Sequence, residues 1–296
     1  MENYKNFKAG FVSLIGKPNV GKSTLMNALM GEKISITTPK PQTTRHQIKG
    51  IFNDEKYQIV FLDTPGFLKP RYALQEKMLE YLRNSIKDSD LIVFITDITT
   101  FPTDYDEELC KQIQNLSTPK IALLNKIDKA DLEILAEKER LVAEYNFEKI
   151  IPISALKMKS GAELLQMISE FLPYNPPFYS PDEVSDLPMR FFVQEIVREQ
   201  IFMNYEDEIP FSSSAVVEQY KEYENKDEIE VNIWIERKSQ KPIMLGKNGE
   251  KIKTVRINAE KEIYKITGRR AKLNLWIKVK PKWRTKTNAL KEFGYR

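Results

Sequence analysis

The feature that most constrains this chain is a glycine-rich loop at residues 16–24, with the sequence GKPNVGKST. It matches the pattern G-x-x-x-x-G-K-[ST], in which backbone N–H groups wrap the phosphates of a nucleotide. An apolar run at residues 11–15 predicts a strand before the loop, and residues 24–30 predict a helix after it. Bound phosphates would then lie at the positive end of that helix. The sequence therefore predicts a nucleotide-binding α/β domain with a mostly parallel sheet and helices on both faces.

Two side chains of this loop have the chemistry that a bound nucleotide needs. Lys22 is placed to reach the outer phosphates, and the hydroxyl of Ser23 is placed to ligate Mg²⁺. We expect the whole loop to contact the nucleotide through Gly16, Lys17, Pro18, Asn19, Val20, Gly21, Lys22, Ser23 and Thr24.

A second motif, Asp63-Thr64-Pro65-Gly66, follows an apolar run at residues 57–62 that predicts another strand. A carboxylate at a strand end can hold Mg²⁺ through its water shell. A glycine three residues later lets a backbone N–H approach the γ-phosphate. We therefore predict a metal role for Asp63 and a γ-phosphate contact for Gly66, although D-x-x-G alone is usually just a turn.

The motif Asn125-Lys126-Ile127-Asp128 indicates which base is bound, and it follows a predicted strand at residues 121–124. A carboxylate at Asp128 can accept hydrogen bonds from both N1–H and the exocyclic N2–H₂ of guanine. Adenine lacks this pair of donors and would leave the carboxylate unpaired. Asn125 would tie the loops together, and the stem of Lys126 would lie along the ring.

The last nucleotide motif, Ile153-Ser154-Ala155, follows a short predicted strand at residues 149–151. A small residue there lets a backbone N–H reach the guanine O6, so Ser154 and Ala155 complete the site. Four motifs in this order on strand ends argue against ATP or a dinucleotide. They predict an enzyme that hydrolyses GTP to GDP with Mg²⁺.

This order of motifs resembles the translation-factor-related GTPases, and the segments 31–37 (GEKISIT) and 42–46 (QTTRH) resemble the Era family in particular. In that family the threonine before the arginine closes over Mg²⁺ and the γ-phosphate as switch I. By this resemblance the threonine is Thr44, with Thr43 as a second candidate and Gln42 beside them in the nucleotide site. The expected catalytic set is then Lys22, Thr44 and Gly66, and the expected metal ligands are Ser23, Thr44 and Asp63.

One position departs from many small GTPases, which carry a glutamine after D-x-x-G to orient the attacking water. This chain has Phe67 there, so hydrolysis must use another group, a partner, or only backbone and metal. We expect slow intrinsic turnover. Similar GTPases with an asparagine at the position of Asn19 can bind K⁺, whose charge then replaces an arginine finger. The alternative is that Asn19 only caps the loop backbone.

The chain is long enough to predict two domains, and prolines are dense at residues 173–181, with Pro188 beyond them. Charge also separates along the chain. Residues 173–236 hold 4 Lys and Arg against 15 Asp and Glu, whereas residues 237–296 hold 19 against 4, a net charge of +15. Such a segment predicts a polyanionic partner, and on charge alone RNA, DNA and an anionic membrane all remain open.

The pattern of residues 189–280 predicts the element order α-β-β-α-β, with G-x-x-G at residues 246–249 between two helical pieces. We predict a helix at 189–204, strands at 213–224 and 229–236, and a last strand of alternating apolar residues at 271–280. The helix after G-x-x-G should turn its apolar residues inward, namely Ile252, Val255, Ala259, Ile263 and Ile266. This order resembles a KH domain of the bacterial type II topology, a smaller α+β domain. Its glycines would let the backbone press against sugar-phosphate, with unpaired bases in the groove alongside. The predicted RNA-binding residues are Gly246, Lys247, Asn248, Gly249, Lys251, Lys253 and Arg256.

A GTPase domain followed by a KH domain resembles the Era family over nearly the whole chain. We predict a G domain at residues 1–172, a linker at 173–188, a KH domain at 189–281 and a basic tail at 282–296. The resemblance implies binding to the 30S subunit and to its ribosomal RNA near the 3′ end, with loose contact with the inner membrane face. We expect a monomer with no DNA partner.

Two rival functions come from other classes. A membrane-surface switch would use the basic segment to bind lipid headgroups. A tRNA-modification enzyme would need a cofactor or cysteine site, and only Cys110 is present. His46 is the single histidine, which excludes a zinc site or triad built from histidines. No apolar stretch reaches 18 residues and no signal peptide precedes the first strand, so we expect an intracellular chain.

Overall fold

The computed structural model of the protein describes residues 5–158 and 161–295. Contacts divide the chain into two compact units, one of residues 1–70 and 78–186 and the other of residues 71–77 and 187–296. Each unit has its own sheet and its own buried core.

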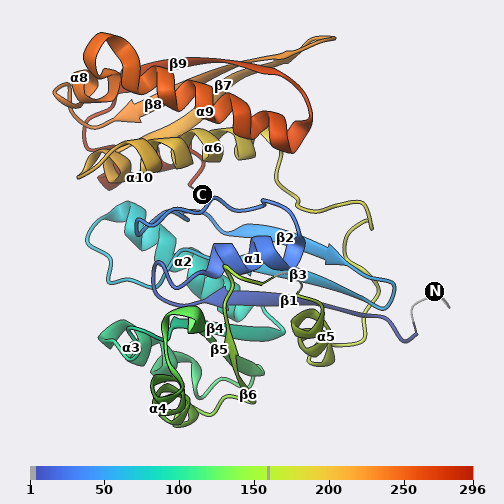
Figure 1. Ribbon diagram of the computed structural model, residues 1–296. Helices are drawn as coiled ribbons and strands as arrows, with labels where there is room; N and C mark the ends of the chain where they lie inside the picture. The colour runs from blue at the N-terminus through green and yellow to red at the C-terminus, as the bar shows by residue number, and fades with distance from the viewer. Residues whose placement is uncertain (1–4, 159–160, 296) are drawn as a thin grey trace. The chain divides into compact units, whose positions relative to one another are not determined.

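The first unit is built on a six-stranded sheet with the order β2-β3-β1-β4-β5-β6 (Figure 1). β2 runs antiparallel to β3, and the other neighbouring strands are parallel. The strands are β1 (Lys8–Ile15), β2 (Ile48–Asn53), β3 (Tyr57–Asp63), β4 (Leu91–Asp97), β5 (Lys120–Asn125) and β6 (Lys149–Ile153).

Helices cover both faces of this sheet, which explains why its central strands are continuous apolar runs. Every residue of β4 and of β5 is buried. Residues of α2, α3 and α4 share one core cluster with Phe94 of β4, while α1 and α5 contact β3. The helices are α1 (Lys22–Met30), α2 (Ala73–Lys87), α3 (Asp104–Ile113), η2 (Ile127–Lys129), α4 (Leu132–Ala143) and α5 (Ala162–Glu170).

The proline-rich residues 173–186, here called the strap, lie along β2 and β3. Gln58 of β3 is fully buried, and its Nε2 donates to the carbonyl of Tyr179 at 2.9 Å. Its Oε1 accepts from the backbone N–H of Phe178 at 2.7 Å and of Tyr179 at 3.1 Å. The N–H of Ile51 on β2 donates to the carbonyl of Val184 at 2.9 Å. The strap is therefore held by backbone groups and by one buried amide.

The second unit has a three-stranded sheet in the order β7-β8-β9, in which β7 is antiparallel and β9 parallel to β8. Helices α6 and α9 pack together on one face of it (Figure 1). This is the predicted α+β order of a type II KH domain. The elements are α6 (Met189–Asn204), α7 (Ile209–Ser212), β7 (Ser214–Glu222), β8 (Asp227–Ile235), α8 (Gln240–Leu245), η3 (Lys247–Gly249), α9 (Glu250–Thr267), β9 (Ala271–Val279), η4 (Trp283–Thr285) and α10 (Thr287–Glu292).

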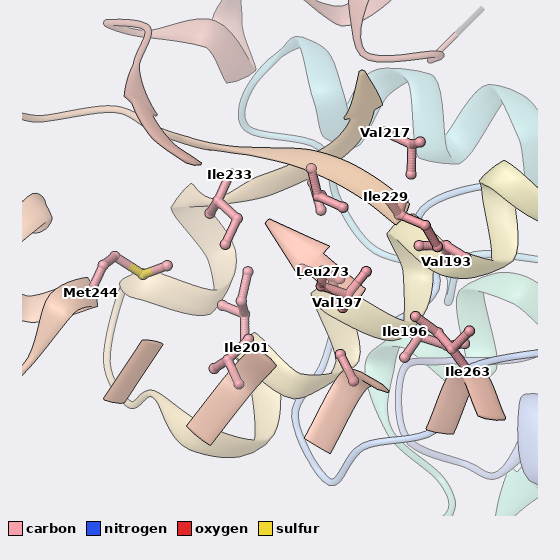
Figure 2. Packing of buried hydrophobic residues seen from close by; sticks show 14 of the residues in the cluster. Val193, Ile196, Val197, Ile201, Val217, Ile229, Ile233, Met244, Ile263 and Leu273 are labelled. Carbon is pink, nitrogen blue, oxygen red and sulfur yellow. The ribbon is translucent and has the colours of Figure 1, made fainter. Parts of the chain in front are cut away.

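The core of this unit follows the predicted alternation of apolar residues. The apolar residues of β8 point at those of α6 and α9, as Figure 2 shows for Ile229, Ile233, Val197 and Ile263. One inward position is wrong. Ile266, in the last turn of α9, is 37% exposed.

Residues 280–295 fold back on the same unit. The indole of Trp283 is fully buried and donates from Nε1 to the carbonyl of Ser212 at 2.9 Å. Phe293 stacks on Trp234, with ring centroids 5.4 Å apart. Trp276, by contrast, is 56% exposed. Among the described residues, no helix is long and apolar enough to cross a membrane.

Candidate functional site

A cavity of about 510 Å³ opens where the carboxyl ends of the central parallel strands meet the glycine-rich loop. This volume is in the range of small-ligand sites. Its lining includes fifteen of the predicted nucleotide-binding residues: Pro18, Asn19, Gly21, Lys22, Ser23, Thr24, Gln42, Thr43, Thr44, Gly66, Asn125, Lys126, Asp128, Ser154 and Ala155. The other predicted residues do not line this cavity, namely Gly16, Lys17, Val20, Asp63, Thr64 and Pro65.

The glycine-rich loop is shaped by a backbone that only glycine tolerates. Gly21 has a φ of +105°, and a Cβ there would lie 2.3 Å from Nδ2 of Asn125. The ammonium of Lys22 lies inside the loop and donates to the carbonyls of Gly16 at 3.1 Å and Lys17 at 2.9 Å. Burial lowers the pKa of Lys22 to about 8, against the opposing charges of Asp63 and Asp106. A phosphate in the cavity would add further negative charge beside this lysine and favour its protonated form.

Three oxygen-bearing side chains meet beside Lys22. The hydroxyl of Ser23 donates to Oδ2 of Asp63 at 2.7 Å and lies 2.9 Å from Oγ1 of Thr44. Neighbouring ligands of an octahedral Mg²⁺, at 2.0–2.1 Å from the ion, are about 2.9 Å apart. Oδ1 of Asp63 is buried and accepts no hydrogen bond from the part of the chain that the structure describes. The donor set and the orphaned oxygen both fit Mg²⁺.

Burial also raises the pKa of Asp63. The hydroxyl of Ser23, the charge of Lys22, the hydroxyl of Ser35 and the N–H of Thr64 act in the opposite direction. A divalent cation would reinforce these interactions and favour the ionised carboxylate.

The structure distinguishes the two threonines of the switch I candidate. Thr44 reaches the hydroxyl of Ser23, whereas the hydroxyl of Thr43 donates to the carbonyl of Lys40 at 2.7 Å. Thr43 is also 2.6 Å from the hydroxyl of Thr38 in the same loop. Thr44 therefore lies next to Ser23, the other hydroxyl of the predicted metal site, and Thr43 braces the loop.

The base end of the cavity is tied together by Asn125. Its Nδ2 donates to the carbonyl of Val20 at 2.6 Å, and its Oδ1 accepts from the N–H of Ala155 at 2.9 Å. Oδ1 of Asp128 accepts from the hydroxyl of Ser154 at 2.5 Å, and this hydrogen bond lowers the pKa of the carboxylate. Asp128 is thus held charged at the place where it would read guanine.

The ammonium group of Lys126 is held by two hydrogen bonds. Its ammonium donates to the carbonyl of Asn19 at 2.8 Å and to Oδ2 of Asp97 at 2.7 Å. Asp97 ends β4, and its other oxygen accepts from the N–H of Thr99 at 3.0 Å. Asp97 was not predicted from the sequence, although its position at a strand end is the same signal that marked Asp63.

The motif Asp63-Thr64-Pro65-Gly66, here called switch II, lies against the glycine-rich loop. A Cβ on Gly66 would come within 2.5 Å of the backbone nitrogen of Pro18, so only glycine fits here. The N–H of Phe67 donates to the carbonyl of Gly16 at 2.9 Å. The ring of Phe67 is buried and packs edge-on against Tyr105, in the core cluster that α3 contributes to. It points away from the cavity and supplies no group to orient water.

Asn19 and Lys17 turn in different directions. Asn19 has a φ of +64°, and its Nδ2 donates to the carbonyl of Pro39 in the switch I candidate at 2.7 Å. Lys17 turns away from the cavity and forms an ion pair of 2.8 Å with Asp106 of α3. Several lining residues were missed, and of these Leu156 directly follows Ala155, so the spacing of the motif could have found it.

The predicted RNA site of the second unit centres on the loop Gly246-Lys247-Asn248-Gly249. Gly246, Asn248 and Gly249 have φ values of +71°, +52° and +77°, which turns the chain sharply between α8 and α9. A Cβ on Gly246 would lie 2.7 Å from Cγ of Lys251, so any larger residue at this position would collide with the start of α9.

The basic residues of the RNA site do not share one helical face. Lys247, Lys251 and Lys253 are exposed and Arg256 is half-buried. Lys251 and Lys253 are two residues apart on α9 and therefore point in different directions, whereas Lys253 and Arg256 are neighbours one turn apart. Beside the loop, Ile243 is 47% and Leu245 37% exposed. The site combines a sharply turned glycine loop, positive charge and exposed apolar side chains.

Comparison with known proteins identifies both units. Residues 11–126 match the family described as 50S ribosome-binding GTPase, and residues 208–284 match the KH domain family. GTPase Era of Clostridium perfringens is 41% identical over 98% of this chain and 99% of its own length. GTPase Era of Alkaliphilus metalliredigens is also 41% identical over the same shares.

Two solved structures match the whole chain. A tyrosine-to-alanine variant of Era from Aquifex aeolicus, bound to GDP and AlF₄⁻, superposes with a TM-score of 0.92 at 38% identity and covers 98% of this chain. Era in complex with MgGDPNP and nucleotides 1506–1542 of 16S ribosomal RNA gives the same TM-score, identity and coverage. Each match spans 99% of the other chain. The chain therefore belongs to the Era family of GTPases.

Proposed function

We propose that this GTPase is a molecular switch that binds a single-stranded segment near the 3′ end of the small-subunit ribosomal RNA and assists assembly of the 30S subunit. The observation that carries the proposal is the presence, in one chain, of a cavity lined by residues of all four nucleotide motifs and a KH unit with a sharply turned G-K-N-G loop. The relative solved with MgGDPNP and 16S ribosomal RNA supports it.

In the nucleotide site, the residues have separate roles. Lys22 neutralises the outer phosphates, and the N–H of Gly66 contacts the γ-phosphate. Ser23, Thr44 and Asp63 hold Mg²⁺, which neutralises charge that develops on the phosphate oxygens. Loss of the γ-phosphate removes the partner of Thr44 and Gly66, so both switches are released after hydrolysis.

For Asn19 we propose a role in K⁺ binding, because Phe67 stands where many small GTPases carry the glutamine that orients water. The amide nitrogen of Asn19 donates to the carbonyl of Pro39, so its oxygen is the atom that would contact K⁺. The charge of K⁺ would assist at the place where an arginine finger acts in other GTPases. Turnover should be faster in K⁺ than in Na⁺ at equal ionic strength. Equal rates in the two salts would contradict this role.

The switch itself is tested by RNA affinity. The full chain is titrated with a short single-stranded RNA matching the 3′ end of 16S ribosomal RNA, once with GDP and once with a non-hydrolysable GTP analogue. We expect different affinities for the two nucleotide states. Equal affinities would remove the proposed coupling, and absence of RNA binding would remove the proposed function.

Two variants locate the RNA site. Gly246→Asp and Gly249→Asp add a side chain and a negative charge where the backbone should approach phosphate, so both should weaken RNA binding without changing GDP affinity. Gly294→Asp is the matched control for Gly249→Asp, since both glycines have a positive φ, of +88° and +77°, and open space around an added Cβ. Equal effects of all three variants would contradict the assignment.

We further propose a cytoplasmic monomer whose basic residues 237–296 make peripheral contact with the inner face of the membrane. The net charge of +15 favours such contact, and it also makes a membrane-surface switch the rival function. Sedimentation with vesicles containing anionic lipid separates the two. Vesicle binding stronger than RNA binding, and unaffected by Gly246→Asp, would favour the membrane switch.

A further inference from the structure

Beside the magnesium position, Ser35 is a buried residue that the nucleotide motifs do not include. It lies in the loop after α1 and is only 1% exposed. Its hydroxyl donates to Oδ2 of Asp63 at 2.8 Å. The same oxygen accepts from the hydroxyl of Ser23 at 2.7 Å. Two donors from different parts of the chain therefore converge on one carboxylate oxygen.

The consequence concerns the direction in which the carboxylate points. The terminal torsion of an aspartate is broad and roughly two-fold, so an unrestrained carboxylate rotates easily. With both hydroxyls on Oδ2, the orientation is fixed and Oδ1 stays buried without a hydrogen bond from the described residues. Mg²⁺ requires near-ideal octahedral geometry, so its affinity depends on such orientation.

Ser35 is itself held by Asn27 of α1. Nδ2 of Asn27 donates to the carbonyl of Ser35 at 2.7 Å. Its Oδ1 accepts from the N–H groups of Ile34 at 2.9 Å and Ser35 at 2.8 Å. Asn27 follows Ser23 by four residues, so both project from the same face of α1. One helix thus places a metal ligand directly and fixes the support of a second ligand through Asn27.

We infer that Ser35 is a positioning residue for Mg²⁺, which acts by orienting Asp63 and is itself fixed by Asn27. The inference rests on the proposed roles of Ser23 and Asp63 as the magnesium side of the nucleotide site. Groups that orient metal ligands in this way change metal affinity about 10- to 100-fold when they are removed. A serine that only filled space would affect stability and leave the metal dependence unchanged.

The test measures release of a fluorescent GDP from the full chain over a range of buffered free Mg²⁺, and GDP affinity in excess EDTA. Ser35→Ala removes the hydrogen-bond donor. Ser35→Cys replaces it with a thiol, a much weaker donor of similar size. In both variants we expect the Mg²⁺ concentration that half-maximally slows release to rise about 10- to 100-fold. Ser35→Thr keeps the hydroxyl and should restore the wild-type value. GDP affinity in EDTA should stay within about twofold of wild type, since the change acts only through the metal.

Ser85→Ala is the matched control. Ser85 is also a buried serine of the first unit, and its hydroxyl donates to the carbonyl of Leu82 at 2.8 Å, away from the cavity lining. It should leave the Mg²⁺ dependence unchanged.

Two results would overturn the inference: an unchanged Mg²⁺ dependence in Ser35→Ala and Ser35→Cys, or an equal loss of GDP affinity with and without Mg²⁺. Neither touches the proposed function, which fails separately if the wild-type protein does not bind GDP.

Discussion

Replacement of Gly66 by alanine should weaken GTP binding selectively. The added Cβ would lie 2.5, 2.6 and 2.8 Å from the backbone nitrogen, Cα and Cδ of Pro18. Ordinary contact begins at about 3.4 Å, so switch II or the glycine-rich loop must move by roughly 0.9 Å. The glycine-rich loop is held by Asn125 and by the ammonium of Lys22, and the displacement therefore falls on switch II.

The size of the effect follows from this displacement. An N–H···O bond of about 2.9 Å to the γ-phosphate would lengthen beyond 3.5 Å and be lost. A hydrogen bond to a charged group contributes about 1.5–3 kcal/mol. Affinity for a non-hydrolysable GTP analogue should therefore fall about 10- to 150-fold. GDP lacks the γ-phosphate, and its affinity should change by less than about threefold.

The assay is calorimetric titration of wild type and Gly66→Ala with GDP and with the GTP analogue, both in excess Mg²⁺. Gly31→Ala is the control, because Gly31 also lies in the first unit, with a φ of +69° and open space around an added Cβ. It should cost about 1 kcal/mol of stability and leave the ratio of the two affinities unchanged. Equal losses for both nucleotides in Gly66→Ala, or no loss for either, would refute the reasoning.

Three further changes test other parts of the molecule. Because the pKa of Lys22 is about 8 without ligand, the lysine must take up a proton on binding GDP as the pH rises. GDP affinity should fall on the order of fourfold between pH 7 and 8.5. Calorimetry in two buffers of different ionisation enthalpy would measure the proton uptake. A GDP affinity that does not change with pH would count against this role of Lys22. The wild type should prefer guanine over adenine nucleotides by a factor on the order of 10⁴, and Asp128→Asn should lose this preference. The variant should instead bind xanthine nucleotides, because xanthine offers an acceptor to the amide N–H₂. Competition of each nucleotide with labelled GDP measures these affinities. Trp283→Ala should lower the free energy of unfolding of the second unit by about 3–5 kcal/mol, because the indole is fully buried. Trp276→Ala, at a site that is 56% exposed, should change it by less than about 0.5 kcal/mol. Urea denaturation of both variants measures the difference.

Much of the fold could be predicted because its parts carry strong local signals. The α6 helix was predicted with its exact ends, and β3 and β9 to within one residue, since alternation and 3.6-residue periodicity report burial directly. The strand β2 carries only a short apolar pattern and a glycine, and it was missed. The α4 helix was missed as well. Only Val142 among its residues is buried, so its apolar stripe is weak.

In the nucleotide site, residues of contiguous motifs could be predicted, whereas a residue that acts through a partner distant in sequence could not. Residues of the nucleotide motifs were found because each motif is contiguous and its chemistry is local. Ser35 was not found, because its function depends on Asp63, which is 28 residues away in sequence and 2.8 Å away in space. The choice between Thr43 and Thr44 could not be made from the sequence either, because it depends on which hydroxyl the loop turns toward Ser23.

The strap changes how a shortened form of this protein should be designed. By composition, residues 173–186 look dispensable to the first unit, and a fragment ending at residue 172 would look complete. Such a fragment would leave the buried amide of Gln58 without its backbone partners and would uncover β2, the terminal strand of the sheet. Bare strand edges pair with other chains, so this fragment should self-associate, and a usable nucleotide-binding fragment should extend to Asp186.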